Sequence, residues 1–331
     1  CKFGDNDMVA ATLSRFDDAE SATRCVSPPD ATWPSTSNDS ASSVLHMMPV
    51  ELTFNGYDSP GSVTVSGVPF TFYHPPSFNI SSVYPLGGPA SGGTQLSIYL
   101  TDNNLHTDLG GGEHGVFCRF SHTEIVGEFD HAHVQVRQVL ARGSLTSCNG
   151  SRVCGAGYSS IACEVPPFND TLANPLEESF DGRDVTVEVT VNGQHFTDGG
   201  VTYRYYDPSV WRIHSFAPRG GPLAGNTSVL LKGFRLQTLG DVRCRFGHLN
   251  SEVNATIVSS GRVQCTSPAH WNRAAQRWNV RAATQQVNLE VTLNGQDYLQ
   301  TLPHQEAFRY YRVDEAMYGL FVRQLDPPGG P

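Results

Sequence analysis

Polar and apolar residues alternate along three similar stretches of the chain, and each stretch ends at an Asn-Gly pair. A period of two is typical of a β-strand with one buried face, so each stretch predicts such a strand. The Asn-Gly pair predicts a two-residue hairpin turn of type I′, in which both central residues have positive φ. The expected buried positions are Val50, Leu52 and Phe54; Val185, Val187, Val189 and Val191; and Val287, Leu289, Val291 and Leu293.

The three strands belong to a repeat of about 100 residues. Each copy has a Cys-x-Phe motif, a second cysteine with proline three residues on, the Asn-Gly pair, and a strand rich in aromatic residues. The second cysteine and the asparagine are 30, 29 and 29 residues apart in the three copies, a constancy that chance does not explain. The first and second cysteines of the three copies are Cys1 and Cys25, Cys118 and Cys163, and Cys244 and Cys265; the asparagines are Asn55, Asn192 and Asn294; the aromatic strands span 70–73, 201–206 and 308–311.

Two copies also share an opening segment. Residues 81–94, "SSVYPLGGPASGGT", align with residues 214–227, "HSFAPRGGPLAGNT". Residues 321–331, "FVRQLDPPGGP", match the first part of the same segment. We therefore expect the sequence to be part of a longer array that is cut inside one repeat at Cys1 and shortly after the start of another at its other end.

These repeats predict an all-β chain of tandem two-layer sandwiches, because each has about seven short strands and no helical periodicity. The short, proline-containing linkers predict a fixed angle between neighbours. Residues 272–286 are expected to be either a short helix or a long loop. The expected parts are 1–75, a partial repeat without its opening strands; 76–207, a repeat with an insertion at about 119–162; 208–313, a further repeat; and 314–331, the opening strand of another.

Composition indicates an extracellular protein. Eight cysteines are an even number and lack the spacing of a zinc site, and six Asn-x-Ser/Thr sequons exceed the roughly three expected by chance. The net charge of −10, without a basic cluster, argues against a nucleic-acid partner. We also expect no membrane span in this segment, since no apolar run approaches about 20 residues. The sequons are at Asn38, Asn79, Asn149, Asn169, Asn226 and Asn254.

The motifs together resemble the IPT/TIG family, the immunoglobulin-like modules of plexins, Met-type receptors, fibrocystin-like proteins and many protist surface proteins. The resemblance covers essentially the whole chain. It departs from the family pattern at Asn226, which replaces the second glycine of a Gly-Gly pair. The opening motif that carries the resemblance consists of Pro85, Gly88, Pro89, Gly92, Gly93 and Thr94.

The resemblance implies immunoglobulin-like sandwiches with one disulfide inside each repeat, and eight cysteines alone would allow 105 pairings. It implies the bonds Cys1–Cys25, Cys118–Cys163 and Cys244–Cys265. The remaining Cys148 and Cys154, in "CNGSRVC", would then pair with each other.

The insertion in the second repeat is one candidate for a specific contact, the alternative being a tolerated and glycosylated surface loop. The histidines around it, in surroundings that we expect to be loops, are interpreted as solvated residues rather than metal ligands. No serine-triad order, GxSxG, HExxH or P-loop motif is present, so neither an enzyme nor a cofactor site is predicted. The histidines are His106, His114, His122, His131 and His133.

The sequence thus predicts a non-enzymatic structural or adhesive segment of a surface filament, coat or flagellar appendage such as a protist mastigoneme. Its expected partners are copies of itself or neighbouring modules, with N-linked sugars and O-linked sugars on the serine-rich residues 35–43. The alternative is the ectodomain stalk of a plexin-like or fibrocystin-like receptor that binds a protein ligand. DNA binding of the Rel type, which also uses this fold, is disfavoured by the acidity, sequons and paired cysteines. A further hypothesis is that the opening strand at 315–331 completes the incomplete first repeat of a neighbouring chain.

Overall fold

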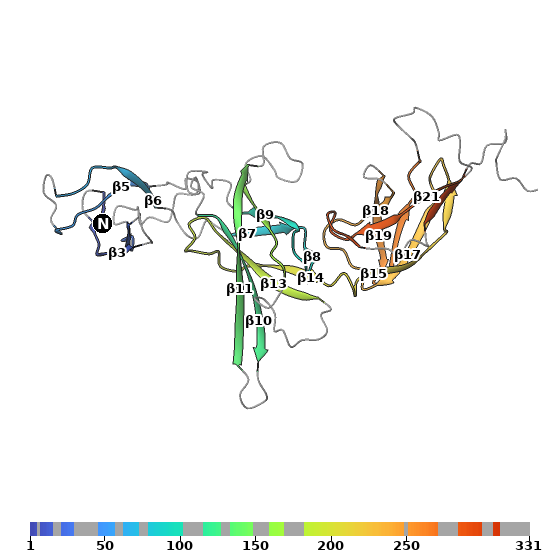
Figure 1. Cartoon of the computed structure of the whole chain (residues 1–331), viewed down its shortest axis with the longest axis horizontal. Helices are drawn as coiled ribbons and strands as arrows, with labels where there is room; N and C mark the ends of the chain where they lie inside the picture. The colour runs from blue at the N-terminus through green and yellow to red at the C-terminus, as the bar shows by residue number, and fades with distance from the viewer. Residues whose placement is uncertain are drawn as a thin grey trace, which may run out of the picture. The chain divides into compact units, whose positions relative to one another are not determined.

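The described residues form β-strands and no helix, which confirms the all-β prediction (Figure 1). They fall into two compact units, Cys1–Phe78 with Asn104–Leu109, and Asn79–Asn103 with Gly110–Pro331, so the predicted boundary at 207/208 lies inside the second unit. The computed structural model describes residues 1–4, 7–15, 21–29, 46–56, 62–72, 79–101, 115–126, 133–147, 159–168, 182–247, 251–270, 284–299 and 307–311.

The first part of the second unit, residues 79–103 and 110–206, is a sandwich that we term the second module. Its strands hydrogen-bond in the order β7-β9-β12-β11-β10-β13-β14-β8. Strand β11 belongs to both layers, because His133–Arg142 pairs with β10 and Gly143–Ser147 pairs with β12. The strands are β7 (Ile80–Tyr84), β8 (Gly87–Pro89), β9 (Gln95–Leu100), β10 (Phe117–Val126), β11 (His133–Ser147), β12 (Ser159–Glu164), β13 (Arg183–Thr190) and β14 (Val201–Tyr206).

Residues 212–311, the third module, repeat this topology. Strand β19 passes from β18 to β20 as β11 passes from β10 to β12. The short strand β16 pairs in parallel with β24 as β8 pairs with β14. The strands are β15 (Arg212–Ala217), β16 (Gly220–Pro222), β17 (Ser228–Phe234), β18 (Arg243–Phe246), β19 (Glu252–Ser259), β20 (Arg262–Thr266), β21 (Thr284–Val287), β22 (Leu289–Thr292), β23 (Tyr298–Leu299) and β24 (Phe308–Tyr311).

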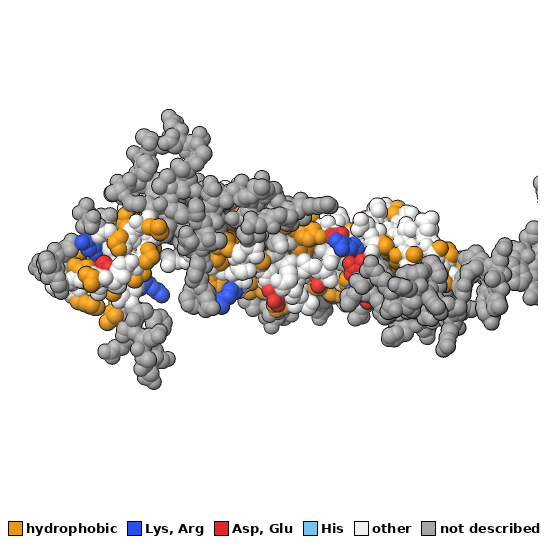
Figure 2. All heavy atoms as spheres, turned by 90° about the horizontal axis from the view of Figure 1, so that it is seen from above, with side chains coloured by type: hydrophobic (Ala, Val, Ile, Leu, Met, Phe, Trp, Pro, Cys, Tyr) orange, Lys and Arg blue, Asp and Glu red, His pale blue; other side chains and the backbone are white. Residues whose placement is uncertain are grey.

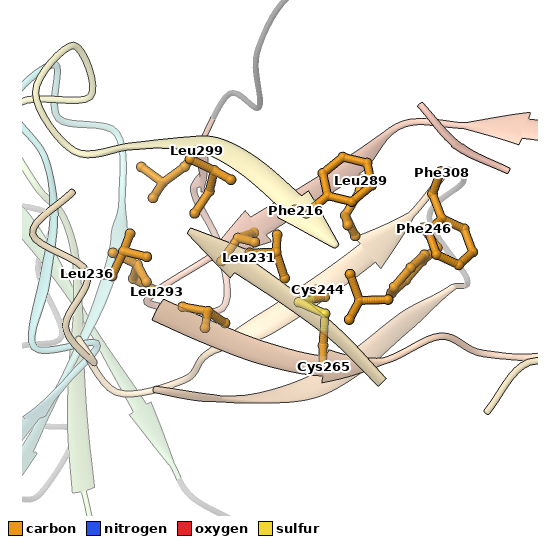
Figure 3. Close-up of a cluster of buried hydrophobic side chains, with 14 of the residues drawn as sticks. Phe216, Leu231, Leu236, Cys244, Phe246, Cys265, Leu289, Leu293, Leu299 and Phe308 are labelled. Atoms are coloured by element: carbon orange, nitrogen blue, oxygen red, sulfur yellow. A yellow bond between two sulfur atoms is a disulfide. The ribbon is translucent and has the colours of Figure 1, made fainter. Parts of the chain in front are cut away.

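Side chains from both layers of the third module form one apolar core, shown in Figure 3. Phe246 and Phe308 pack edge to face with ring centroids 5.1 Å apart, and the Cys244–Cys265 disulfide lies among the aliphatic side chains. Burying each large apolar side chain stabilises the fold by about 1.5–3 kcal/mol. The predicted alternation is confirmed here and in the second module: Val185, Val187, Val189, Val191, Val287, Leu289, Val291 and Leu293 are all buried.

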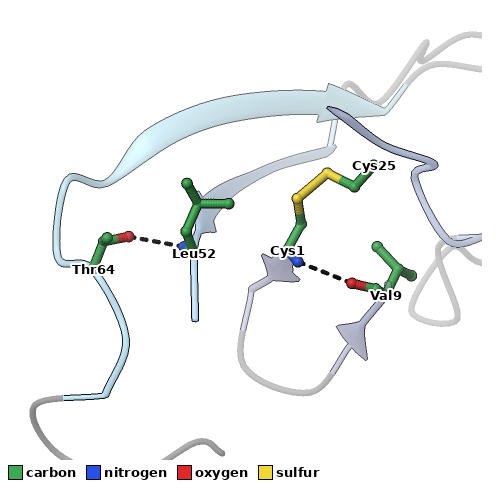
Figure 4. Close-up of a disulfide and its surroundings, with 5 residues drawn as sticks. All are labelled: Cys1, Val9, Cys25, Leu52 and Thr64. Atoms are coloured by element: carbon green, nitrogen blue, oxygen red, sulfur yellow. Dashed lines mark hydrogen bonds between the residues drawn. A yellow bond between two sulfur atoms is a disulfide. The ribbon is translucent and has the colours of Figure 1, made fainter. Parts of the chain in front are cut away.

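Residues 1–72 of the first unit, the first module, contain a four-stranded sheet in the order β2-β1-β5-β6 and a separate pair, β3-β4. The Cys1–Cys25 disulfide joins them, and the Cys1 amino group donates to the Val9 carbonyl (Figure 4). Hydrophobic side chains lie at the surface of this unit (Figure 2). The strands are β1 (Lys2–Phe3), β2 (Asp7–Met8), β3 (Ala11–Arg15), β4 (Ser21–Cys25), β5 (His46–Glu51) and β6 (Val68–Phe72).

The prediction for Phe54 was wrong, because its side chain is 85% exposed. Strand β5 ends at Glu51, so Phe54 lies in the following turn, beside an open cavity of about 420 Å³ that Leu52 and Leu13 also line. The equivalent Leu293 follows its strand in the same way but is covered by the rest of the third module's core.

The type I′ turn was also predicted wrongly. Gly56, Gly193 and Gly295 have φ near +70° to +80°, but among the described non-glycine residues only Asn226 and Arg235 have positive φ. The asparagine of each Asn-Gly pair therefore lacks the left-handed conformation that a type I′ turn requires.

Two further predictions are only partly covered by the described residues. Of the stretch 272–286, Thr284–Gln286 begin strand β21, and the rest lies outside them. The expected opening strand at 314–331 also lies outside them.

Candidate module-module interface

Three of the four disulfides implied by the resemblance are present in the described structure. The Cα atoms of Cys118 and Cys163 are 6.5 Å apart, and those of the other two pairs are each 6.3 Å apart. Each bond joins two segments that do not pair with each other, and such a bond stabilises a module by about 2–4 kcal/mol, mainly by restricting its unfolded state. Such bonds are typical of an oxidising, extracellular compartment. The remaining cysteines, Cys148 and Cys154, lie outside the described residues.

The sequons that the structure describes are accessible. Asn79, Asn226 and Asn254 are exposed, the last on strand β19. Asn38, Asn149 and Asn169 lie outside the described residues, as do residues 35–43.

Most of the described part of the insertion belongs to strands β10 and β11, which pair as a β-hairpin. Beyond Ser121, strand β10 pairs only with β11, so the two strands continue as an arm (Figure 1). His122 lies in β10, with its Nδ1 atom 3.3 Å from the Asp184 carbonyl oxygen, and His133 begins β11, so the loop surroundings expected for these two histidines are wrong. The described residues contain no group of three potential metal ligands, and His106, His114 and His131 lie outside them.

A turn of the third module docks on the opening segment of the second. Asn294, fully buried, accepts hydrogen bonds through Oδ1 from the backbone N–H groups of Gln296 (3.0 Å) and Asp297 (2.8 Å). The Thr292 hydroxyl donates to the same oxygen at 3.0 Å. The side chain thus fixes the turn, which leaves its Nδ2 group free to donate to the Gly87 carbonyl at 2.9 Å.

The next two residues of the turn complete the contact. The Thr94 hydroxyl donates to Asp297 Oδ2 at 2.7 Å, and Asn294 Nδ2 donates to the same oxygen at 2.7 Å. The Gln296 amide bonds both backbone groups of Gln95, accepting from its N–H and donating to its C=O, each at 2.9 Å. These bonds specify a single register between the turn and the start of strand β9.

A loop of the third module adds a second contact. The Leu86 N–H donates to the Leu239 carbonyl at 2.7 Å, and the Tyr84 hydroxyl donates to Asp241 Oδ2 at 3.2 Å. Burial, together with the neighbouring Asp241 carboxylate, raises the pKa of Tyr84. Arg243 also pairs with Asp241 Oδ2, so this carboxylate has a cation and a phenol as partners.

The connection between the modules is short, and a buried aromatic side chain lies at each of its ends. Tyr206, the last residue of β14, stacks on Trp211 with ring centroids 5.0 Å apart and an interplanar angle of 17°. Both belong to the core of the third module, and only 3% of Trp211 is exposed. Asp207 accepts from the Ser209 N–H through its side chain and from the Trp211 N–H through its carbonyl. The linker is therefore ordered by its own hydrogen bonds as well as by packing.

The same turn occurs in the other two modules. The Thr190 hydroxyl donates to Asn192 Oδ1 at 3.0 Å, and the Thr53 hydroxyl to Asn55 Oδ1 at 2.8 Å. Sequence analysis missed this Thr-x-Asn-Gly motif and the roles of Gln296 and Asp297. The recurrent threonine two residues before each asparagine was the available signal.

The third module matches a known family model. The model of the IPT/TIG domain matches residues 212–310. Residues 212–310 form an IPT/TIG domain. The second module has the same strand topology and the same disulfide position, so the chain carries tandem IPT/TIG-type sandwiches.

Among solved structures, this chain is similar to two of the plexin A4 full extracellular region. The one with domains 1 to 10 has a TM-score of 0.43 and 17% identity, and covers 92% of this chain. The one with domains 1 to 8 has a TM-score of 0.27 and 12% identity, over 72% of this chain. The match spans 21% of the first plexin chain and 25% of the second. No curated protein matches the chain. Within the described residues, no helix has the length and apolar character needed to cross a bilayer.

The interface between the IPT/TIG domain and the second module is built from hydrogen-bonded polar groups. It unites a carboxylate, two carboxamides and backbone groups that satisfy one another, with Tyr84 and Leu86 at its edge. Hydrogen bonds between side chains and backbone fix orientation strongly because their geometry is narrow. The arrangement can hold two sandwiches at a set angle.

Proposed function

We propose that this chain is a non-enzymatic, extracellular structural or adhesive segment in which successive IPT/TIG modules are locked together. The observation that carries the proposal is the Asn294 turn, buried on the opening segment of the preceding module. A segment that must transmit force or keep a spacing needs such a junction, whereas independent modules would be joined by a flexible linker. The stacked Tyr206 and Trp211 support the same conclusion, because their contact holds the two ends of the linker together.

The distance distribution between the two modules tests this proposal. Probes at Asp198 in the second module and Val258 in the third, both exposed, report their relative orientation. We expect a single narrow distribution that broadens when Asn294 and Asp297 are both changed to Ala. A broad distribution in the unaltered chain would contradict a rigid junction.

For the assembly that contains this chain, we propose a surface filament, coat or flagellar appendage of the mastigoneme kind, built by contacts between modules. The repeats, the disulfides and the exposed sequons support this assignment. Electron microscopy of the native material, with intact mass before and after deglycosylation, tests it. Regular filaments and a mass loss on deglycosylation are expected. Dispersed particles would instead favour the ectodomain stalk of a plexin-like or fibrocystin-like receptor that binds a protein ligand.

The arm formed by β10 and β11 is the part of the insertion proposed to contact a neighbour in such an assembly. One face exposes Val134 and Val136, which are 65% and 53% exposed, and Leu140, 55% exposed, continues this face at the base of the arm. The other carries the Arg137–Glu124 ion pair at 2.7 Å. Val134→Ser with Val136→Ser should reduce filament formation, and the matched change Val258→Ser, at a 52% exposed position of the third module, should not.

A further inference from the structure

The third module presents an opening face built like the one that is already occupied. Strand β16 pairs with β24 in the register Gly221↔Tyr310, as β8 pairs with β14 in the register Gly88↔Tyr205. A Cβ atom on Gly221 would lie 2.1 Å from Thr227 Oγ1, and the matching distance from Gly88 to Thr94 Oγ1 is 2.3 Å. Thr227 therefore holds the place in the third module that Thr94 holds in the second.

The two faces differ in what covers them. Thr94 is 1% exposed because the docked turn covers it, whereas Thr227 is half-buried. Pro85 and Gly87 are likewise buried, while their counterparts Pro218 and Gly220 are exposed and half-buried. The equivalent residues of the third module are thus accessible, whereas in the second module the docked turn covers them.

We propose that this opening face, formed by Gly220, Thr227 and Ser228, docks the Thr-x-Asn-Gly turn of a further IPT/TIG module. The occupant is a further module of the same type, and the recurrence of the Gly-Gly-Pro motif at residues 329–331 supports this choice. Its asparagine amide donates to the Gly220 carbonyl, and its side chain three residues later accepts from the Thr227 hydroxyl. The inference rests on the proposed function, since it repeats the same junction one module further along.

The sequon at Asn226 lies beside this opening face, and a sugar there would not block docking. Asn226 has φ of +62°, close to the +88° of its counterpart Gly93. A Cβ atom on Gly93 would meet nothing within 4 Å, although the third module is docked next to it. A side chain at this position therefore points into open space, and a sugar on Asn226 would flank the contact.

One contact of the known junction cannot recur. Ala217 replaces Tyr84, so a following module lacks the phenol that donates to Asp241 in the existing junction. The turn contacts remain available, because they involve backbone groups and Thr227. We expect the second junction to depend more strongly on the turn than the first.

An extended chain provides the test. A second copy of Asp207–Tyr311 replaces residues 312–331, so the third module follows itself through its own linker. Amide hydrogen exchange at residues 227 and 228 is compared with that of the 331-residue chain. We expect exchange to slow by about fivefold on docking. Asn294→Ala with Asp297→Ala, made only in the added copy, should restore the original rate, as should Thr227→Val.

Unchanged exchange at residues 227 and 228, with the added copy folded and its disulfide formed, would overturn the proposal. If the extension misfolds, the same measurement is made on the full-length protein, provided that its gene encodes a further repeat. Protection of residues 227 and 228 there supports the inference, and exchange as in the 331-residue chain overturns it. A gene that encodes no further Asn-Gly turn also overturns it. The junction at Asn294 is measured separately by the distance distribution, so the two proposals can fail independently.

Discussion

Asn294 Nδ2 donates a 2.9 Å hydrogen bond to the carbonyl of Gly87, a residue 207 positions earlier in the chain. The amide is fully buried, and its oxygen is already used to shape its own turn. A buried amide without partners would cost about 1–3 kcal/mol, so the turn gains from the partner that Gly87 supplies. The folding of the third module's turn and its docking are therefore coupled through one side chain.

Asp297→Ala should weaken the junction. The change removes the acceptor of the Thr94 hydroxyl and of the Asn294 amide, and hydrogen bonds to a charged group are worth about 1.5–3 kcal/mol. We expect a loss of about 2 kcal/mol in the free energy of unfolding of the second unit, measured in urea. His195→Ala is the matched control at the same position of the exposed second-module turn, and a comparable loss there would contradict this account.

The sequence predicted the strands and core faces of the second and third modules, because alternation and repeat spacing report local geometry. The sequence did not predict which side chains of different motifs contact one another. The arginine of each Cys-Arg-Phe motif pairs with a glutamate on the neighbouring strand of the sheet, β13 or β22, as in Arg245–Glu290 at 2.7 Å. Arg245 also lies 3.6 Å from the centroid of the Tyr298 ring. Such partners depend on strand order, which a single sequence does not specify.

The candidate interface could not be predicted from the sequence for a related reason. The Asn-Gly pairs were recognised, but as type I′ turns closed by their own backbone. Thr94 was recognised only as part of an opening motif and Gln95 was not singled out, since their partners are about 200 residues away. The three Asn-Gly turns look alike in sequence, and burial distinguishes the docked one.

Trp211→Ala should destabilise the third module strongly. The side chain is buried and stacks on Tyr206, and removing a buried tryptophan or phenylalanine costs about 3–5 kcal/mol. Phe234→Ala, at a 53% exposed position of the same module, should cost under about 1 kcal/mol. Chemical denaturation followed by circular dichroism gives both values. Equal losses would show that the stacked pair is not part of the core.

Cys244→Ala with Cys265→Ala should lower the stability of the third module by about 2–5 kcal/mol. The bond joins residues 21 positions apart and lies inside the core, so both the unfolded state and the packing change. Calorimetry of this double variant against the unaltered chain measures the loss. The Cys118–Cys163 bond of the second module should still be detected by peptide mapping, and its loss would mean that the two modules do not oxidise independently.

Glu51 should make the first module sensitive to acid. Hydrogen bonds from the Thr64 hydroxyl and the Gly67 N–H hold the pKa of Glu51 below its ordinary value of 4.5. A carboxyl group whose folded pKa is lowered stabilises the fold above its unfolded pKa, and this stabilisation is lost as pH falls through the folded pKa. We expect stability to fall below about pH 4.5 and Glu51→Gln to flatten that fall, in denaturation curves between pH 3 and 6. An unchanged pH profile in the variant would exclude this role.

Gly88→Ala should disrupt the opening segment of the second module. A Cβ atom there would lie 2.3 Å from both Thr94 Oγ1 and the Tyr203 hydroxyl oxygen, which no real contact allows. Both neighbours are buried, Thr94 within the docked junction and Tyr203 in the core. Neither can therefore move away without a cost in free energy. We expect a loss of at least about 2 kcal/mol and a broadened distance distribution between the modules. Gly199→Ala is the control, because its Cβ would meet nothing within 4 Å despite a φ of +72°. If Gly88→Ala costs no more than this control, the segment is free to rearrange, and the docked turn does not depend on its close packing.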